Sequence, residues 1–378
     1  MVAQAAPKPA KPSGTVYYAI DPNESERIQL WRLWMTFFMP LRHVYSTAFR
    51  AGGAGAAAYV EPDWLYFIQY ILTEIMPRFV PSAFSLIAAV LLFRKPFDYG
   101  KNVVRKFRTL IMPLFLLTSF WIALYAVGPF IPGLGKLFSS ETTRVADWSA
   151  SQWFAAYLGW TPEHQLPTLL YPLWFMRDLM LMNLIAPAVK WIIDRIPRIF
   201  LGVLAVMLLL KTESLFYFHT IHQVFIFFCL GYYVVKYDLH FSDLDKISWK
   251  WIGGLYVLSI AGAYLLRDYV DVYSGIRGIP NLMGVLFFAK FMSKLPASPK
   301  WRRRFLWLAE YNVAIYLFHE RMLTFAKKLM LRLLPASLPS SLLLFYGLPV
   351  VITAACVGVG WFLRKYQPRV YRLVTGSR

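Results

Sequence analysis

Charged side chains are scarce in this sequence, and acidic ones are scarcer still. Charged residues make up 16% of the 378 positions, and 20 Asp and Glu stand against 40 Lys and Arg, for a net charge of +20. Soluble globular domains carry about 25% charged residues. A disordered chain has far fewer apolar side chains than the 58% found here. The composition therefore excludes both classes.

Cysteine is almost absent, and so is any secretory signal. The two cysteines, Cys229 and Cys356, lie in strongly apolar runs. Two such residues cannot build a disulfide framework and lack the spacing of metal ligands, so we expect small buried side chains and no metal site. The Pro-, Ala- and Lys-rich N-terminus has no apolar signal core. We expect residues 1–26 to form a flexible cytoplasmic tail.

Long apolar segments, by contrast, recur along the whole chain. Each is long enough to cross the bilayer core as a helix, which predicts an all-α, polytopic transmembrane bundle of about ten spans within residues 27–366. The expected spans are 28–48, 79–93, 109–127, 168–187, 199–210, 216–235, 251–266, 276–293, 305–323 and 341–363. The additional apolar segment 62–77 carries Glu74, and we interpret it as a re-entrant or interfacial helix.

The basic residues orient these spans. When both termini are placed in the cytoplasm, most Lys and Arg fall in cytoplasmic loops such as 94–108 and 294–304, as the positive-inside rule requires. Residues 367–378 then form a basic cytoplasmic tail, and membrane lipids are partners. The pI of about 9.9 needs no nucleic acid, because the sequence has no pattern of an RNA- or DNA-binding module.

Three cations, Arg32, Arg177 and Lys290, fall inside expected spans, where a charge is costly and usually functional. Arg32 and His43 share the first span and are eleven residues apart. Because that is about three helical turns, they share one face and lie about 16 Å apart. The pair can supply an anion-binding group and a general base. Alternatively, Arg32 reaches to the inner headgroups and His43 marks the outer interface; the two residues alone do not decide between these readings.

Two other charged pairs are candidates. Arg105 and Arg108 lie on one helical face at the cytoplasmic entrance of the third span, where they can bind phosphates or simply lipid headgroups. Arg177 and Asp178 are adjacent in the fourth span. Because neighbouring residues of a helix point in different directions, we expect each to pair with another helix rather than with its neighbour.

Histidines gather toward the outer side in this topology. Five of the six lie there, namely His43, His164, His219, His222 and His319. His219 and His222 have a spacing that suits a metal, but no carboxylate or thiol lies beside them. Each histidine alone is best explained as an interfacial residue, and only their common side favours a function.

Several strings, taken in order, resemble the integral-membrane acyltransferase-3 family over residues 28–365. They are the Arg32 and His43 pair, VPSAFSLIAAVLLFRK, KNVVRKFRTLIMP with Arg105, Arg108 and Pro113, YPLWFMRDLM, and AEYNVAIYLFHERML with His319. Two departures stand out. Ile87 and Ala88 replace the usual Ser-Gly of the second helix, which puts the packing of that helix in doubt, and Asn312 replaces a frequent Ser.

The resemblance implies an enzyme of the bacterial inner membrane. It would transfer an acetyl or succinyl group from cytoplasmic acyl-CoA, the donor substrate, to hydroxyls of an exported polysaccharide or glucan. In such an enzyme Arg105, Arg108 and Arg32 bind CoA phosphates, and His43 accepts a proton or carries the acyl group. His319 or Arg177 supports the carbonyl oxygen. The size and layout are also similar to acyltransferases encoded beside bacterial cellulose synthases, which would make cellulose the acceptor and synthase subunits partners.

Two other functions use the same residues. An exporter of glycan or lipid-linked sugar would use the charged groups as a pathway and would not transfer acyl groups. A non-catalytic subunit of a polysaccharide synthase would tolerate neutral substitutions at Arg32 and His43, whereas deletion would disrupt assembly.

Overall fold

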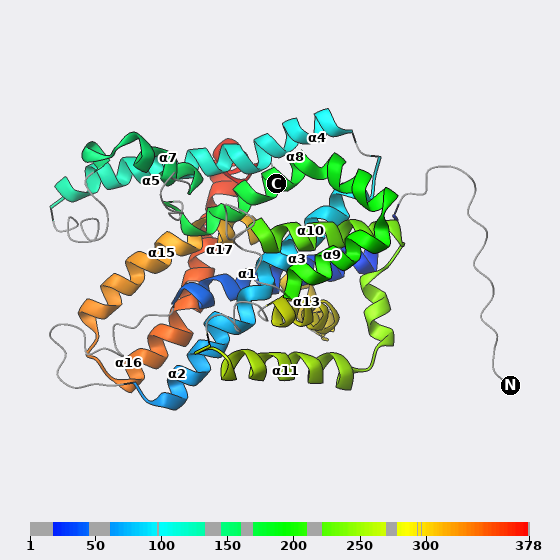
Figure 1. Ribbon diagram of the computed structural model, residues 1–378. Helices are drawn as coiled ribbons and strands as arrows, with labels where there is room; N and C mark the ends of the chain where they lie inside the picture. The colour runs from blue at the N-terminus through cyan, green and yellow to red at the C-terminus, as the bar shows by residue number, and fades with distance from the viewer. Residues whose placement is uncertain are drawn as a thin grey trace.

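The computed structural model describes residues 18–44, 61–96, 98–132, 145–159, 169–209, 221–269, 278–292, 294–295 and 297–376. Within these ranges all regular elements are helices, which confirms the all-α prediction. Figure 1 shows α1 (Pro22–Val44) running through the middle of the bundle. Residues 18–26, expected in a flexible tail, contain the start of this helix. Tyr18 donates a hydrogen bond to Glu24 there.

The buried core is formed by α1 and a surrounding group of helices, and the other helices pack against this group. The surrounding helices are α3 (Phe79–Phe93), α8 (Trp174–Arg195), α10 (Ile221–Lys236), α13 (Gly278–Met292), α15 (Asn312–Leu333) and α17 (Leu348–Tyr366). The others are α2 (Asp63–Tyr70), α4 (Tyr99–Lys106), α5 (Met112–Val127), α7 (Ala150–Leu158), α9 (Pro197–Leu209), α11 (Trp249–Leu265), α14 (Pro299–Ala309), α16 (Leu338–Leu342) and α18 (Pro368–Thr375). The main hydrophobic cluster joins α1, α3, α8, α10 and α13.

Three π-helical turns occur where a proline follows. They are η1 (Ile71–Ile75), η3 (Phe107–Ile111) and η9 (Leu343–Gly347), and the prolines are Pro77, Pro113 and Pro349. A proline has no N–H to donate to the carbonyl four residues earlier, and its ring clashes with that carbonyl. A wider turn upstream relieves the clash and lets the helix continue.

These turns join shorter helices into long apolar ones. Among the described residues, three helices are long and apolar enough to cross a membrane, namely Asp63–Phe93, Tyr99–Phe130 and Leu338–Tyr366. The segment 62–77, which we interpreted as a re-entrant or interfacial helix, continues directly into α3, and its place relative to the membrane stays a prediction. The total number of spans and the side of the termini stay predictions.

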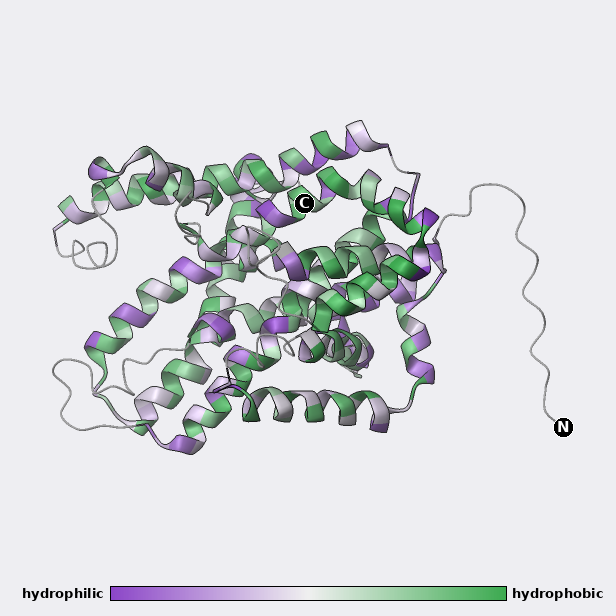
Figure 2. Ribbon diagram, viewed as in Figure 1, coloured by the Kyte–Doolittle hydropathy of each residue, from purple (hydrophilic) through white to green (hydrophobic). Residues whose placement is uncertain are grey.

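Large apolar side chains are exposed on several helices of the bundle, which is compatible with a membrane protein. Figure 2 shows hydrophobic residues dominating α5, α9 and α10, whereas α15 carries hydrophilic residues along its length. Val257 and Leu258 on α11 and Val350 on α17 are each more than 60% exposed. Side chains of this kind are compatible with contact to lipid, which is as apolar as they are.

The contact between α3 and α10 depends on a glycine. A Cβ added at Gly231 would lie 2.5 Å from the Leu86 carbonyl oxygen and 2.7 Å from the Ala89 Cβ. Small residues allow such close approach of membrane helices. This packing answers the question raised by Ile87 and Ala88, because α3 is held along its length against α10.

Replacing Gly231 with valine should therefore destabilise the protein, because the added side chain forces the two helices apart. Overpacking of this kind costs about 1–3 kcal/mol or more. Thermal unfolding of the purified protein in detergent measures the effect. Gly202→Val is the matched control, since a Cβ at Gly202 meets no atom within 4 Å. Equal unfolding temperatures for the two variants would contradict the prediction.

Lys290 has a structural role. It lies on α13 and is 1% exposed, yet its amine donates hydrogen bonds to the carbonyls of Leu244, Asp245 and Ile247. Those carbonyls lie at the end of the 3-10 segment η8 (Phe241–Lys246), where backbone acceptors lack helical partners. The buried charge is thus satisfied by backbone oxygens.

Candidate active site

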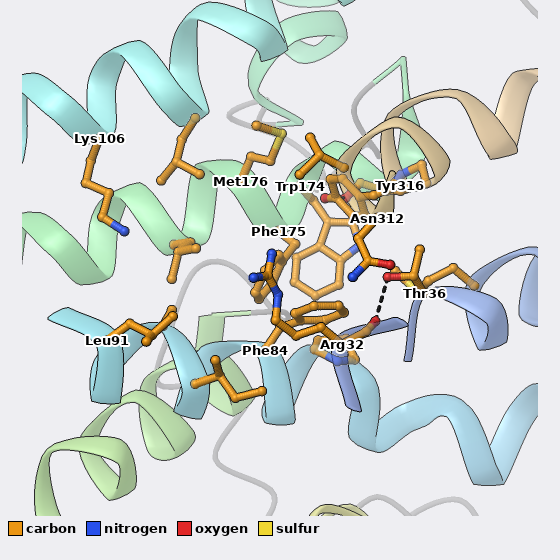
Figure 3. Close-up of a pocket in the computed structure, with 18 residues that line it drawn as sticks. Arg32, Thr36, Phe84, Leu91, Lys106, Trp174, Phe175, Met176, Asn312 and Tyr316 are labelled. Atoms are coloured by element: carbon orange, nitrogen blue, oxygen red, sulfur yellow. Dashed lines mark hydrogen bonds between the residues drawn. The ribbon is translucent and has the colours of Figure 1, made fainter. Parts of the chain in front are cut away.

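A cavity of about 300 Å³ lies between α1, α3, α8, α15 and the α4–η3 helix (Figure 3). Most of its wall is apolar. The apolar lining residues are Met39, Pro81, Phe84, Ile87, Ala88, Leu91, Leu110, Pro172, Phe175, Met176, Leu179 and Val313. Side chains with polar groups come from Arg32, Thr36, Lys106, Trp174, Asn312 and Tyr316. The cavity thus combines an apolar chamber with two cations.

One face of α1 lines this chamber and leads to a histidine pair. Arg32, Thr36 and Met39 follow one another at spacings of four and three residues, and all line the cavity. His43, four residues further on, continues this face. Its ring lies 5.6 Å from that of His319 and 5.6 Å from that of Tyr171, measured between centroids. The predicted common face of Arg32 and His43 agrees with this geometry.

His319 is held in one orientation and one tautomer. It is fully buried on α15, and its Nδ1 lies 2.9 Å from the carbonyl oxygens of both Ile315 and Tyr316. Because carbonyl oxygens only accept hydrogen bonds, Nδ1 must carry the proton, and Nε2 of the neutral ring holds a lone pair. This Nε2 is buried and has no hydrogen-bond partner within the described structure. The arrangement suits a proton acceptor.

Arg32 brings a positive charge into the apolar chamber. Its guanidinium points into the cavity near Phe84 and Trp174 (Figure 3), and its backbone carbonyl accepts a hydrogen bond from the Thr36 hydroxyl. No carboxylate of the described ranges forms an ion pair with this guanidinium. A partly buried cation without an anion is costly, and an anionic group of a ligand would compensate it.

Lys106 is a cavity residue that we did not single out from the sequence. Its amine points into the same chamber from the helix that carries Arg105 and Arg108 (Figure 3). A usable signal was present, because Lys106 lies four residues before the buried Leu110 and therefore on its face. In the sequence, Lys106 was not distinguished from the neighbouring basic residues at the cytoplasmic entrance of the third expected span.

Arg105 and Arg108 face a second, open pocket of about 540 Å³. They share it with Lys101 and Thr109, which agrees with the prediction of a common face. Lys101 forms an ion pair with Asp98, and its hydrogen bonds to this carboxylate lower the pKa of Asp98. Arg105 donates a hydrogen bond to the neutral amide of Asn102. The two arginines thus keep their charge available at the surface.

The profile of a family described as an acyltransferase domain matches residues 28–363. The chain belongs to this acyltransferase family. It is also similar to the succinoglycan biosynthesis protein ExoH of Rhizobium meliloti (strain 1021), with 25% identity over 372 residues, covering 95% of this chain and 94% of that protein. No solved structure matches the chain. The family membership confirms the resemblance seen in the sequence and shows that the protein is an acyltransferase.

Arg177 of this acyltransferase does not face the cavity, and our expectation for it was wrong in one respect. Its Nε donates to Asp178 Oδ1 at 2.7 Å, and the two residues form a buried ion pair. It also donates to the carbonyl of Leu158. The Arg side chain is long enough to reach around the helix to its neighbour, and burial of both charges favours their pairing. Arg177 thereby fastens the end of α7 to α8.

Of the other histidines expected on the outer side, the structure describes only His222, which does not line the cavity. His222 Nε2 lies 2.9 Å from the carbonyl oxygen of Met207, which connects α10 with α9. His164 and His219 lie outside the described residues. Where the structure describes the chain, it contains no group of three residues arranged to hold a metal ion.

The departures from the family pattern lie in the cavity wall. Ile87 and Ala88 of α3 and Asn312 of α15 all line the chamber. The Oδ1 of Asn312 is buried and has no hydrogen-bond partner in the described part of the chain. These three positions therefore shape the space that a ligand would occupy.

Proposed function

We propose that this acyltransferase moves an acetyl or succinyl group from cytoplasmic acyl-CoA to a hydroxyl of an exported polysaccharide or glucan. The observation that carries the proposal is the cavity, whose lining on α1 runs from Arg32 to Met39, one helical turn before the pair of His43 and His319. The similarity to a protein named for succinoglycan biosynthesis supports a polysaccharide acceptor. The bacterial inner membrane fits a donor inside and an acceptor outside. Cellulose as acceptor and synthase subunits as partners are finer proposals, which rest on overall layout alone.

The two pockets suit the two ends of acyl-CoA. Arg105 and Arg108 in the open pocket provide forked donors for phosphate oxygens. The neighbouring apolar chamber suits the acyl-bearing arm, and Lys106 extends from the same helix into it. Arg32 lies deeper, where it can bind a carbonyl oxygen on which negative charge develops, or the carboxylate of a succinyl group.

The histidine pair provides the base. As the acceptor hydroxyl oxygen attacks the thioester carbonyl carbon, its proton passes to a histidine nitrogen. The carbon–sulfur bond then breaks, and the proton is returned to the CoA thiolate. In this reaction His43, one helical turn beyond the cavity-lining Met39, contacts the hydroxyl, and His319 Nε2 supplies a second acceptor beside it. Neutral His319 has no free N–H for a carbonyl oxygen, so its place is on the base side of the reaction.

The proposal is tested by incubating membranes that contain the protein with radiolabelled acetyl-CoA or succinyl-CoA and the exported polysaccharide. Label should appear in the polysaccharide, and mass spectrometry should locate an ester that is absent from a deletion strain. An exporter would move polysaccharide and leave it unlabelled. A non-catalytic subunit would support labelling equally well with His43→Ala, which contradicts the proposal.

Ile87 should limit the size of the transferred group, because its side chain is 2% exposed and lines the chamber. Ile87→Ala removes about three carbons and should favour longer acyl groups. A methylene in an apolar pocket changes discrimination about 10–200-fold. The measured quantity is the ratio of kcat/KM for butyryl-CoA to that for acetyl-CoA. Leu204→Ala, at a buried position of α9 that does not line the cavity, is the control and should leave the ratio unchanged.

A further inference from the structure

The last helix, α18, folds back onto the protein. It packs against α5 and α17. Tyr371 and Thr375 are buried on its inner side, and the Thr375 hydroxyl donates to the Tyr371 carbonyl. The segment 367–378, expected as a basic tail, thus contains a docked helix. These buried residues hold the last turn of α18 against the protein.

That end is Gly376, which lies against the backbone of Thr109. Gly376 has a φ of +71°, a conformation that favours glycine. A Cβ added there would lie 2.6 Å from the Thr109 Cα and 2.8 Å from the Thr109 carbonyl oxygen. Both the backbone conformation and the close contact therefore require glycine. The end of α18 therefore packs closely against the π-helical turn η3.

The turn that Gly376 contacts carries Arg108. A π-helical turn is rare and wider than an α-helical one. Its position relative to the preceding turn, which carries Arg105, therefore depends on what packs against it. Gly376 packs against it at Thr109, the residue after Arg108, and itself lines the open pocket. The end of the C-terminal helix thus contacts the turn that carries one of the two guanidiniums.

The pocket chemistry indicates the ligand. Arg105 and Arg108 have no ion pair with a carboxylate in the part of the chain described, and Lys101 adds a third cation at the rim. Gly100, in the same pocket, leaves open space beside its Cα, since a Cβ there meets no atom within 4 Å. The guanidinium groups of two arginines, with open space beside them, are suited to bind the oxygens of a phosphoryl group.

We propose that α18 is a positioning element for the donor. Docking of Gly376 on Thr109 holds Arg105 and Arg108 at the spacing that binds the phosphoryl groups of CoA. This inference rests on the proposed function, because it concerns the same donor pocket. It adds a requirement for the C-terminal helix, whose end contributes Gly376 to the pocket lining.

The test uses the full-length protein, purified in nanodiscs of phosphatidylcholine, with unacylated CoA as the calorimetric probe. Gly376→Val should raise the Kd for CoA about tenfold, which corresponds to the loss of roughly one charge-assisted hydrogen bond. The KM for acetyl-CoA should rise equally, with kcat unchanged. Gly202→Val, at a position of α9 that lines neither pocket and where a Cβ meets no atom within 4 Å, should bind CoA like the wild type. If Gly376→Val fails to fold, a chain that ends at Thr375 removes the same contact.

The outcomes separate this inference from the proposed function. If the folded Gly376→Val variant binds CoA like the wild type while Arg108→Gln binds it weakly, the proposed role of α18 is overturned and the donor site stands. Wild-type binding by both variants removes the donor site as well. In nanodiscs that contain phosphatidylglycerol, a variant that loses lipid binding and keeps CoA binding would show that the pocket serves a lipid phosphate, which also overturns the inference.

Discussion

Replacement of His43 or His319 by alanine is expected to lower the rate of acyl transfer by about 10²–10⁴-fold, the usual value of general-base catalysis. The centroids of the two rings lie 5.6 Å apart, and in the proposed reaction both histidines serve the same proton transfer. Residues that work as a unit show non-additive losses, so the double variant should be about as slow as the slower single one. Multiplied losses would contradict a shared role.

The tautomer of His319 sharpens this prediction. Because Nδ1 donates to the Ile315 and Tyr316 carbonyls, only Nε2 is left to accept a proton. His319→Gln, whose amide oxygen can reach the Nε2 position, should retain more activity than His319→Leu. The measurement is kcat for labelled acetyl transfer, with the unfolding temperature as the check on folding. Equal activity of the two variants would leave His319 with a packing role only.

Arg32→Met is the second change with a large expected effect. Loss of one preorganised donor at a developing negative charge costs about 10²–10³-fold in kcat. Stability should change in the opposite direction, because the variant removes a partly buried charge that has no ion-pair partner among the described residues. The two measurements are kcat for acyl transfer and the unfolding temperature in detergent.

A neighbouring residue on α1 provides the control. Thr36→Val changes the same cavity wall but removes only a hydroxyl that bonds to the Arg32 carbonyl within the helix. Its kcat should stay within about threefold of the wild type, as for most changes that leave charge untouched. An Arg32→Met protein that is both less stable and fully active would show that Arg32 serves the fold.

Local sequence rules predicted the features that depend on one helix. The common face of Arg32 and His43 follows from their spacing alone, and so does that of Arg105 and Arg108. The π-helical turns were also open to prediction, since each precedes a proline inside an apolar run. The prediction for Arg177 and Asp178 missed their ion pair, because helical direction was considered without the length of the Arg side chain; Arg177 does also bond to another helix, at the carbonyl of Leu158.

Contacts between helices were beyond these rules. Nothing in the strings around His43 and His319 indicates that the two rings meet, because α1 and α15 are far apart in the chain. The sequence did not distinguish Lys106 from the other cytoplasmic cations, whereas the structure places it in a cavity that residues of α3 and α8 also line. Only the structure shows that Ile87 and Asn312, which depart from the family pattern, both line the cavity.

The sequence by itself determined the class of this protein. Its apolar segments, its basic loops and its ordered family strings depend on composition and local spacing, which the chain carries before it folds. Tertiary structure alone decided the site. The cavity, the free Nε2 of His319 and the docking of Gly376 on Thr109 arise only when helices distant in sequence pack together. Packing of this kind depends on the shapes of both partners at once, and no single segment encodes it.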